Sequence, residues 1–168
     1  MPVSVKTVKN DFPKMEASIK DLNGLRVNVG VLGGEHAWLA SIHEYGCKIK
    51  VTPKMRAWFA HRGFPLKKST TEITIPERSF LRAGFDENAD KVLKTTESVL
   101  PDVLIGTLSV EQYAKLVGLQ LSSAIKKYAV DLKSPPNSEF TIKQKGSSNP
   151  LVDTGNMVNS ITYEVVKE

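Results

Sequence analysis

Residues 109–132 read SVEQYAKLVGLQLSSAIKKYAVDL and carry the strongest structural pattern in this 168-residue chain. Ser109 and Gln112 have the spacing of a capping box, in which each side chain bonds the backbone N–H of the other residue. Apolar side chains then recur every three or four residues, which predicts one buried face of an α-helix. They are Tyr113, Val117, Leu121, Ile125, Tyr128 and Leu132. Pro135 and Pro136 follow and end the helix, because proline has no backbone N–H to donate.

Shorter elements are predicted on both sides of this helix. Leu25, Val27 and Val29 alternate with polar residues or glycine, the two-residue period of a half-buried strand. Further strands are expected around 49–51, 73–75 and 161–165. Helices are expected at about 11–22, 35–45, 53–63, 86–100 and 139–144. The sequence therefore predicts an α+β fold with a small, mostly antiparallel sheet flanked by two or three helices. We expect one domain over residues 1–168, with an N-terminal helix at about 11–22 and a core at about 25–166.

The spacing of apolar residues also predicts which helix faces are buried. The N-terminal helix continues a stripe that begins at Val5 and Val8, with Asp11 as its expected cap. In the helix at 35–45, one face carries Trp38, Ile42 and Tyr45. In the helix at 86–100, the predicted inward residues are Ala89, Val92, Leu93, Thr96 and Val99.

The composition is that of an ordinary folded protein. Hydrophobic residues make up 40% of the chain and charged residues 24%, so disorder is not expected. No apolar run approaches the roughly 20 residues that span a bilayer, and no apolar block follows the first lysines, so we expect neither a membrane span nor a signal peptide. Cys47 is the single cysteine, which excludes an internal disulfide.

Positive charge is concentrated in one segment. The net charge is +5, and no acidic residue lies between Glu44 and Glu72. The basic residues in that interval are Lys48, Lys50, Lys54, Arg56, Arg62, Lys67 and Lys68. Together with Trp58 and Phe59 they could contact DNA or a protein partner. Met55, Trp58 and Phe59 are also spaced i, i+3, i+4, which favours packing of the aromatic side chains instead.

Catalytic patterns are weak in this sequence. Asp153-Thr154-Gly155 occurs in aspartic proteases, but such enzymes need two aspartates that share a proton. The triplet occurs once here and leads into polar residues, so we expect Asp153 to cap a turn. We expect no catalytic residue, no cofactor and no metal site, and we do not expect an enzyme.

Four stretches, taken in order, resemble the tail-completion or head–tail joining proteins of tailed bacteriophages, also called virion morphogenesis proteins. The first stretch ends in His43, Glu44, Tyr45 and Gly46; the second, 75–82, includes Arg78, Phe80 and Leu81; the third is 135–147; the fourth contains Pro150, Leu151, Asp153, Thr154 and Gly155. The resemblance covers about 25–166. It departs at Ser79, where many relatives have proline, and in the block 51–68, which many shorter relatives lack.

The resemblance implies a structural protein of the virion neck that is made in the host bacterial cytoplasm. It implies a ring, commonly of six copies, between the head connector or adaptor and the tail tube or tail terminator. It also implies structural roles for the motif residues: Gly46 and Gly155 permit turns, and Phe80, Leu151 and Ile161 pack. Genomic DNA passing through such a ring could contact the basic segment. The alternative is a basic accessory protein that binds nucleic acid.

Overall fold

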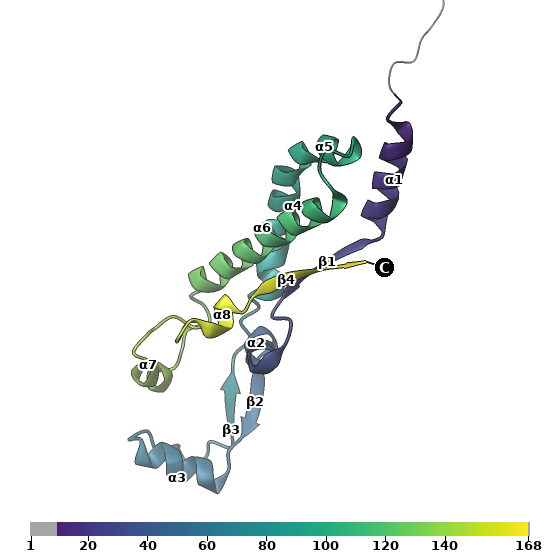
Figure 1. The fold of residues 1–168 in the computed structure, drawn as a ribbon. Helices are drawn as coiled ribbons and strands as arrows, with labels where there is room; N and C mark the ends of the chain where they lie inside the picture. The colour runs from purple at the N-terminus through teal and green to yellow at the C-terminus, as the bar shows by residue number, and fades with distance from the viewer. Residues whose placement is uncertain (1–9, 168) are drawn as a thin grey trace, which may run out of the picture.

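The computed structural model describes residues 10–167, and it has an elongated shape with α3 at one end and α1 and α5 toward the other (Figure 1). In chain order the elements are α1 (Phe12–Asn23), β1 (Leu25–Gly30), α2 (Gly34–Tyr45), β2 (Cys47–Lys50), α3 (Pro53–His61), β3 (Glu72–Ile75), α4 (Leu81–Thr96), the 3-10 turn η1 (Glu97–Val99), α5 (Leu100–Leu104), α6 (Val110–Asp131), α7 (Glu139–Lys145), α8 (Asn156–Asn159) and β4 (Thr162–Lys167).

The long helix α6 is the centre of the fold, and its predicted start is confirmed. The Ser109 hydroxyl accepts the N–H of Gln112 at 3.1 Å, and the Gln112 amide oxygen accepts the N–H of Ser109 at 3.0 Å. Every residue of the predicted apolar face is buried or half-buried. α4 packs along α6, and the strands β1 and β4 pack on it as well.

The first sheet pairs the strand that follows α1 with the last strand of the described chain. β1 and β4 run antiparallel from Leu25 opposite Lys167 to Gly30 opposite Thr162. The ring of Tyr163 lies directly on Gly118 of α6, where an added Cβ would come within 2.4 Å of the ring. Because Gly118 has no side chain, β4 can lie this close to α6.

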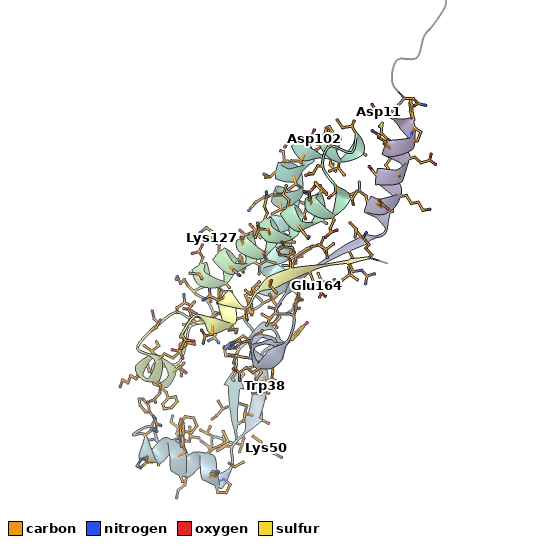
Figure 2. All side chains as sticks on the ribbon, in the orientation of Figure 1. Asp11, Trp38, Lys50, Asp102, Lys127 and Glu164 are labelled. Atoms are coloured by element: carbon orange, nitrogen blue, oxygen red, sulfur yellow. The ribbon has the colours of Figure 1, made fainter. Side chains whose placement is uncertain are left out.

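A second sheet stands apart from the first. β2 and β3 pair antiparallel from Cys47 opposite Ile75 to Lys50 opposite Glu72, and this hairpin leads to α3 (Figure 1). Lys50 lies where β2 reaches α3 (Figure 2). The predicted α+β class is thus confirmed, with the strands divided between two antiparallel pairs rather than gathered in one sheet.

The prediction for residues 86–100 is wrong in two respects. The helix begins at Leu81 and ends at Thr96, where a 3-10 turn follows. Val92 and Thr96 are buried as predicted, together with Gly84, whereas Leu93 is 52% exposed. The early start is caused by the carboxylate of Glu44 in α2, which binds the first N–H groups of α4.

Two other helices bury less than their apolar residues predict. α2 turns Ala40 and Glu44 inward and leaves Trp38 and Tyr45 exposed, so the expected apolar face is wrong for these two residues, whereas Ile42 is half-buried. α1 matches its predicted bounds but buries no residue, and Asp11 makes no side-chain capping bond. Val5 and Val8 of the expected stripe lie outside the described residues.

The core lies between α6, α4 and the C-terminal segment. It contains Phe80, Leu121, Ile125, Leu151 and Ile161 together with smaller apolar side chains. The predicted packing roles of Phe80, Leu151 and Ile161 are therefore confirmed. Within residues 10–167, no helix combines the length and apolar character that crossing a membrane requires.

Candidate functional site

The first two motif stretches meet at the carboxylate of Glu44. This side chain is 2% exposed at the end of α2. It accepts hydrogen bonds from the Ser79 hydroxyl (2.8 Å), from the backbone N–H groups of Leu81 (2.8 Å) and Arg82 (3.1 Å), and from the Arg82 guanidinium (2.9 Å). A carboxylate is favourable there because the first N–H groups of a helix have no partner within the helix and carry partial positive charge.

The surroundings of Glu44 keep it ionised. Burial alone would raise the pKa of its carboxyl group, but the N–H groups of Leu81 and Arg82, the Ser79 hydroxyl and the Arg82 guanidinium together hold that pKa below its usual value. Glu44, which lies in α2, therefore caps the start of α4, a role that a residue at the start of the helix usually fills. The Ser79 hydroxyl is one of these donors, and a proline at this position could not supply it.

Arg78 connects the same junction to the loop after α6. It is 4% exposed, and its backbone N–H donates to the carbonyl of His43 at 2.7 Å. Its guanidinium donates to the carbonyl oxygens of Pro135 (2.8 Å) and Pro136 (3.0 Å) and to the side-chain oxygen of Asn137 (3.2 Å). A planar guanidinium can bond several carbonyls at once, so Arg78 holds the second and third motif stretches together.

His43 lies in this junction with its side chain half-buried. Its Nδ1 is 3.5 Å from a guanidinium nitrogen of Arg78. Burial, with the positive charges of Arg78 and Lys145, lowers the pKa of His43 to about 4. The ring is therefore neutral at physiological pH.

Gly46 lets two chain segments approach closely. Its φ is +68°, and an added Cβ would lie 2.8 Å from both the backbone nitrogen of Glu77 and the carbonyl oxygen of Ile75. The ring centroid of the preceding residue, Tyr45, lies 4.8 Å from the Arg82 guanidinium carbon. The predicted turn at Gly46 is confirmed, and its contact with the end of β3 explains why glycine is required.

The fourth stretch reaches the junction through Asn149, which no sequence pattern singled out. The side-chain oxygen of Asn149 accepts the N–H groups of Leu151 and Val152, each at 3.0 Å, and its amide donates to the carbonyl of Val130 at 2.9 Å. Asn149 also accepts a bond from Asn137 at its backbone carbonyl. Pro150 and Leu151 are thereby held, buried, against the end of α6.

The predicted capping role of Asp153 is wrong. α8 begins after Gly155, whose φ is +84°, and no side chain caps its first turn. Thr154 makes a long contact of 3.4 Å to the N–H of Asn156. The turn therefore depends on the left-handed conformation of Gly155, as predicted for that residue, and Asp153 stays exposed.

The basic segment is divided by the structure into structural arginines and exposed lysines. Arg56 donates to the carbonyl oxygens of Lys67, Lys68 and Thr70 and so holds the loop after α3. Arg62 donates to the side chain of Gln144 on α7 at 2.7 Å. The remaining members are exposed: Lys48, Lys50, Lys54, Lys67 and Lys68.

Aromatic side chains attach α3 to α7. Phe140 lies between Trp58, Phe59 and Phe64, with ring centroids 5.7, 4.9 and 5.1 Å away. The predicted packing of Trp58 and Phe59 is confirmed, although Trp58 remains 45% exposed. Because Phe59 is packed in this cluster, its ring has little freedom to stack on a base. The ring of Trp58 has more freedom to do so, because it is partly exposed.

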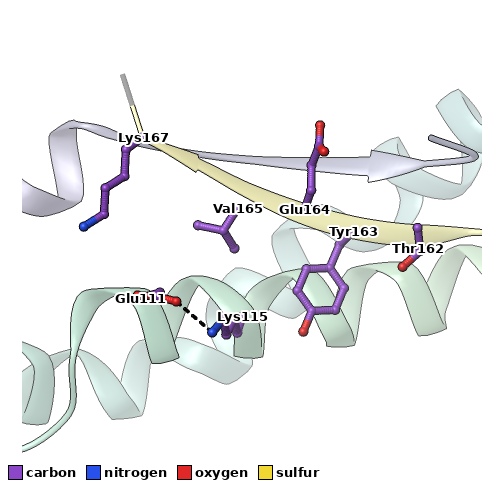
Figure 3. Close-up of a pocket in the computed structure, with 7 residues that line it drawn as sticks. All are labelled: Glu111, Lys115, Thr162, Tyr163, Glu164, Val165 and Lys167. Carbon is purple, nitrogen blue, oxygen red and sulfur yellow. Dashed lines mark ion pairs between the residues drawn. The ribbon is translucent and has the colours of Figure 1, made fainter. Parts of the chain in front are cut away.

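A groove follows the outer edge of β4. It has a volume of about 550 Å³ and lies between β4 and α6, with Tyr163 and Val165 on one side and the Glu111–Lys115 ion pair (2.7 Å) on the other (Figure 3). β4 pairs only with β1 among the described strands, so its outer N–H and C=O groups face this groove or solvent. Such an edge can accept a further strand.

Within residues 10–167, no group of three or more His, Cys, Asp or Glu side chains could hold a metal ion. The side chains of Glu44, Arg78 and Asn149 are instead bonded to backbone atoms and to neighbouring side chains. The junction formed by residues 43–46, 78–82, 135–137 and 149–151, called the motif junction below, is thus built to fix the chain in place.

Comparison with protein-family models, with curated proteins and with solved structures finds no match to this chain.

Proposed function

We propose that this chain is a structural subunit of the neck of a tailed bacteriophage or prophage, in which it forms a ring that completes the tail or head and joins the two. The observation that supports this most is the motif junction. Stretches up to about a hundred residues apart, singled out for their resemblance to neck proteins, meet there and bond one another's backbone.

The chemistry of the junction favours assembly over catalysis. Glu44 and Arg78 are the charged groups buried in it, and both are engaged by several hydrogen bonds. A catalytic acid or base needs a free position for substrate. When the buried polar groups of a subunit serve to hold its chain rigid, the subunit acts through its outer surface.

The outer surface has features suited to partners. The edge of β4 is open to a groove, and large apolar side chains are exposed at separate places on the molecule. They include Trp38, Tyr45, Trp58, Phe85, Leu93 and Leu119. In the proposed role, further copies of this chain form a ring of six. The head connector or adaptor binds one side, and the tail tube or tail terminator binds the other. The site of action is the virion neck, reached from the host bacterial cytoplasm during assembly.

Deletion of the gene from the phage that encodes it tests the proposal. Electron microscopy of the lysate should show DNA-filled heads and finished tails that are not joined, and a plasmid copy of the gene should restore joined particles. Infectious particles at normal titre from the deletion would refute the proposal. Tails of abnormal length with joined heads would instead indicate a function in tail-length control.

Nucleic-acid binding is a second candidate, favoured by the exposed lysines around α3. If it is the main function, affinity for duplex DNA should survive physiological salt and should fall when Lys54 and Lys67 are reversed in charge. A steep loss of affinity between 50 and 200 mM salt, with no sequence preference, would indicate incidental electrostatic attraction.

A further inference from the structure

One end of the molecule carries an apolar hollow within a basic surface. Lys54, Met55, Trp58 and Phe59 of α3 line a depression of about 380 Å³. Trp58 keeps 45% of its surface exposed even though its ring packs edge-on against Phe59 and Phe140. An exposed aromatic side chain beside an open hollow is typical of a surface that receives a partner.

Lys54 lines this hollow, Lys67 and Lys68 lie in the loop that Arg56 of α3 holds, and the positive charge of this end of the molecule is uncompensated. Arg56 and Arg62 bond neighbouring loop and helix atoms, but the side chains of Lys54, Lys67 and Lys68 make no ion pair within residues 10–167. No acid occurs between Glu44 and Glu72. We call the hollow with these three lysines the basic tip. Its occupant should therefore be apolar at the centre and acidic at the rim.

The outer face of α4 has that composition. α4 packs on α6 through Gly84, Val92 and Thr96, which leaves Phe85 (47% exposed) and Leu93 (52%) on its free side. Phe85, Ala89 and Leu93 are four residues apart and form a stripe along the helix. Next to the stripe lies a row of exposed charged residues made of three acids, Asp86, Asp90 and Glu97, and one base, Lys94; Glu97 belongs to the 3-10 turn that follows α4. None of the three acids has an ion-pair partner in the described part of the chain. We call this stripe and row the acidic face.

We propose that the basic tip of one copy docks on the acidic face of a second copy. Met55 and Trp58 would pack against Phe85 and Leu93, while the tip lysines would pair with the row of acids. The two surfaces have opposite charge and matching apolar centres, and each lacks a partner in the described chain. DNA would match the lysines of the tip but would leave the acidic face without a role.

The position of the two surfaces determines what this contact builds. α3 lies at one end of the elongated molecule, while α4 lies along its body beside α6 (Figure 1). The contact therefore joins different surfaces on two copies, which is a heterologous interface. Repetition of such a contact gives a closed ring or an open helical assembly. This inference rests on the proposed function in one respect: the proposed ring needs a contact between copies, and the docking supplies that contact.

Charge reversal of the full chain tests the contact. Lys54→Glu with Lys67→Glu gives a tip-reversed variant, and Asp86→Lys with Asp90→Lys gives a face-reversed variant. By sedimentation velocity, each variant alone should associate about tenfold more weakly than the original chain, a change of about 1.4 kcal/mol. An equimolar mixture of the two variants should associate again, because each reversed surface then meets an opposite charge on the other variant.

Matched controls separate this contact from general charge effects. Lys14→Glu with Lys20→Glu makes the same charge change on exposed positions of α1 and should leave association unchanged. Leu93→Asp, which alters an exposed side chain, should weaken association at an unchanged melting temperature. Together with the recovery in the mixture, these results would support the inference.

Three outcomes of the association measurements would overturn the inference. They are a monomer at all concentrations, association unaffected by either reversal, and a mixture that stays dissociated although the original chain assembles. Loss of DNA binding in the tip-reversed variant, with self-association intact, would assign the tip to nucleic acid and would also overturn it. Each of these results differs from failure of the proposed function, which is measured by head–tail joining in the deletion phage.

Discussion

The guanidinium of Arg82 binds Glu44 twice, at the carboxylate (2.9 Å) and at the backbone carbonyl (3.2 Å). A third bond, of 2.6 Å, reaches the carboxylate of Glu77. Glu44 is buried, whereas the Arg82 side chain is half exposed. This pair therefore links the end of α2, the segment after β3 and the first turn of α4, and it closes the motif junction toward solvent.

Replacing Glu44 should test how strongly α4 depends on this carboxylate. Glu44→Gln keeps one acceptor oxygen but places an amide N–H₂ against donors, and we expect a loss of about 2–3 kcal/mol in the free energy of unfolding. Urea unfolding at pH 7 measures it. Glu77→Gln is the matched control, because Glu77 is exposed and bonds only Arg82 among the described groups; its cost should stay below about 1 kcal/mol. Equal losses in the two variants would show that the buried carboxylate is not special.

Substitution of two glycines allows the cost of backbone strain to be measured separately from the cost of steric overlap. Gly46→Ala should lower the free energy of unfolding by about 3 kcal/mol, because it adds a clash with the backbone of Ile75 and Glu77 to the cost of a left-handed conformation. Gly63 has a similar φ of +78° and nothing within 4 Å of an added Cβ. Gly63→Ala should therefore lose only about 1 kcal/mol. Thermal or urea unfolding decides between the two, and similar losses would contradict the close approach at Gly46.

The low pKa of His43 predicts acid sensitivity in a defined pH window. In the folded protein the pKa is about 4, lowered by burial and by Arg78 and Lys145, against an ordinary value of 6.5. As pH falls from about 6.5 to about 4, the unfolded chain takes up a proton that the folded chain resists, so stability is lost in that window. Because the ring is only partly buried, we expect a loss of roughly 2 kcal/mol.

A pair of variants attributes this pH dependence to His43. Between pH 6.5 and pH 5, His43→Gln should flatten the slope of unfolding free energy against pH. His61→Gln alters an exposed histidine and should leave the slope of the original chain. The account is contradicted if both variants keep the original slope.

Gly118 and Tyr163 should show strong coupling. Gly118→Ala adds a methyl group into the ring of Tyr163, and we expect a net loss of about 1–2 kcal/mol despite the better helix propensity of alanine. In a Tyr163→Leu background the same change should become neutral or stabilising by up to about 1 kcal/mol. A double-mutant cycle by urea unfolding measures the coupling. If the cost of Gly118→Ala is the same in both backgrounds, the ring does not set the approach of β4 to α6.

Local patterns in the sequence were sufficient to predict most of the secondary structure. The capping box at Ser109 and Gln112 and the apolar period of α6 depend on neighbours within one or two helical turns, and both were confirmed. The alternating residues of β1 and β4 identified strands for the same reason. Their partners depend on the whole chain, so the division into two separate sheets did not follow from the pattern.

The motif junction could be predicted only in part. The motif residues near Glu44, Arg78 and Leu151 were selected, but Asn149 was not, since an asparagine before proline in a polar loop has no distinctive spacing. The start of α4 was also misplaced, because its capping carboxylate comes from Glu44, 37 positions before Leu81. Capping rules consider only nearby residues, so a helix begun by a distant side chain lies outside their reach.

The central claim, that this chain joins phage heads to tails, is tested most directly by adding the purified protein to a lysate of the deletion phage and measuring the titre of infectious particles. The account predicts that the titre rises by orders of magnitude as filled heads and finished tails become joined, and that Gly63→Ala protein restores it equally. A titre that stays at the level of the untreated lysate, with heads, tails and added protein all intact, would contradict it.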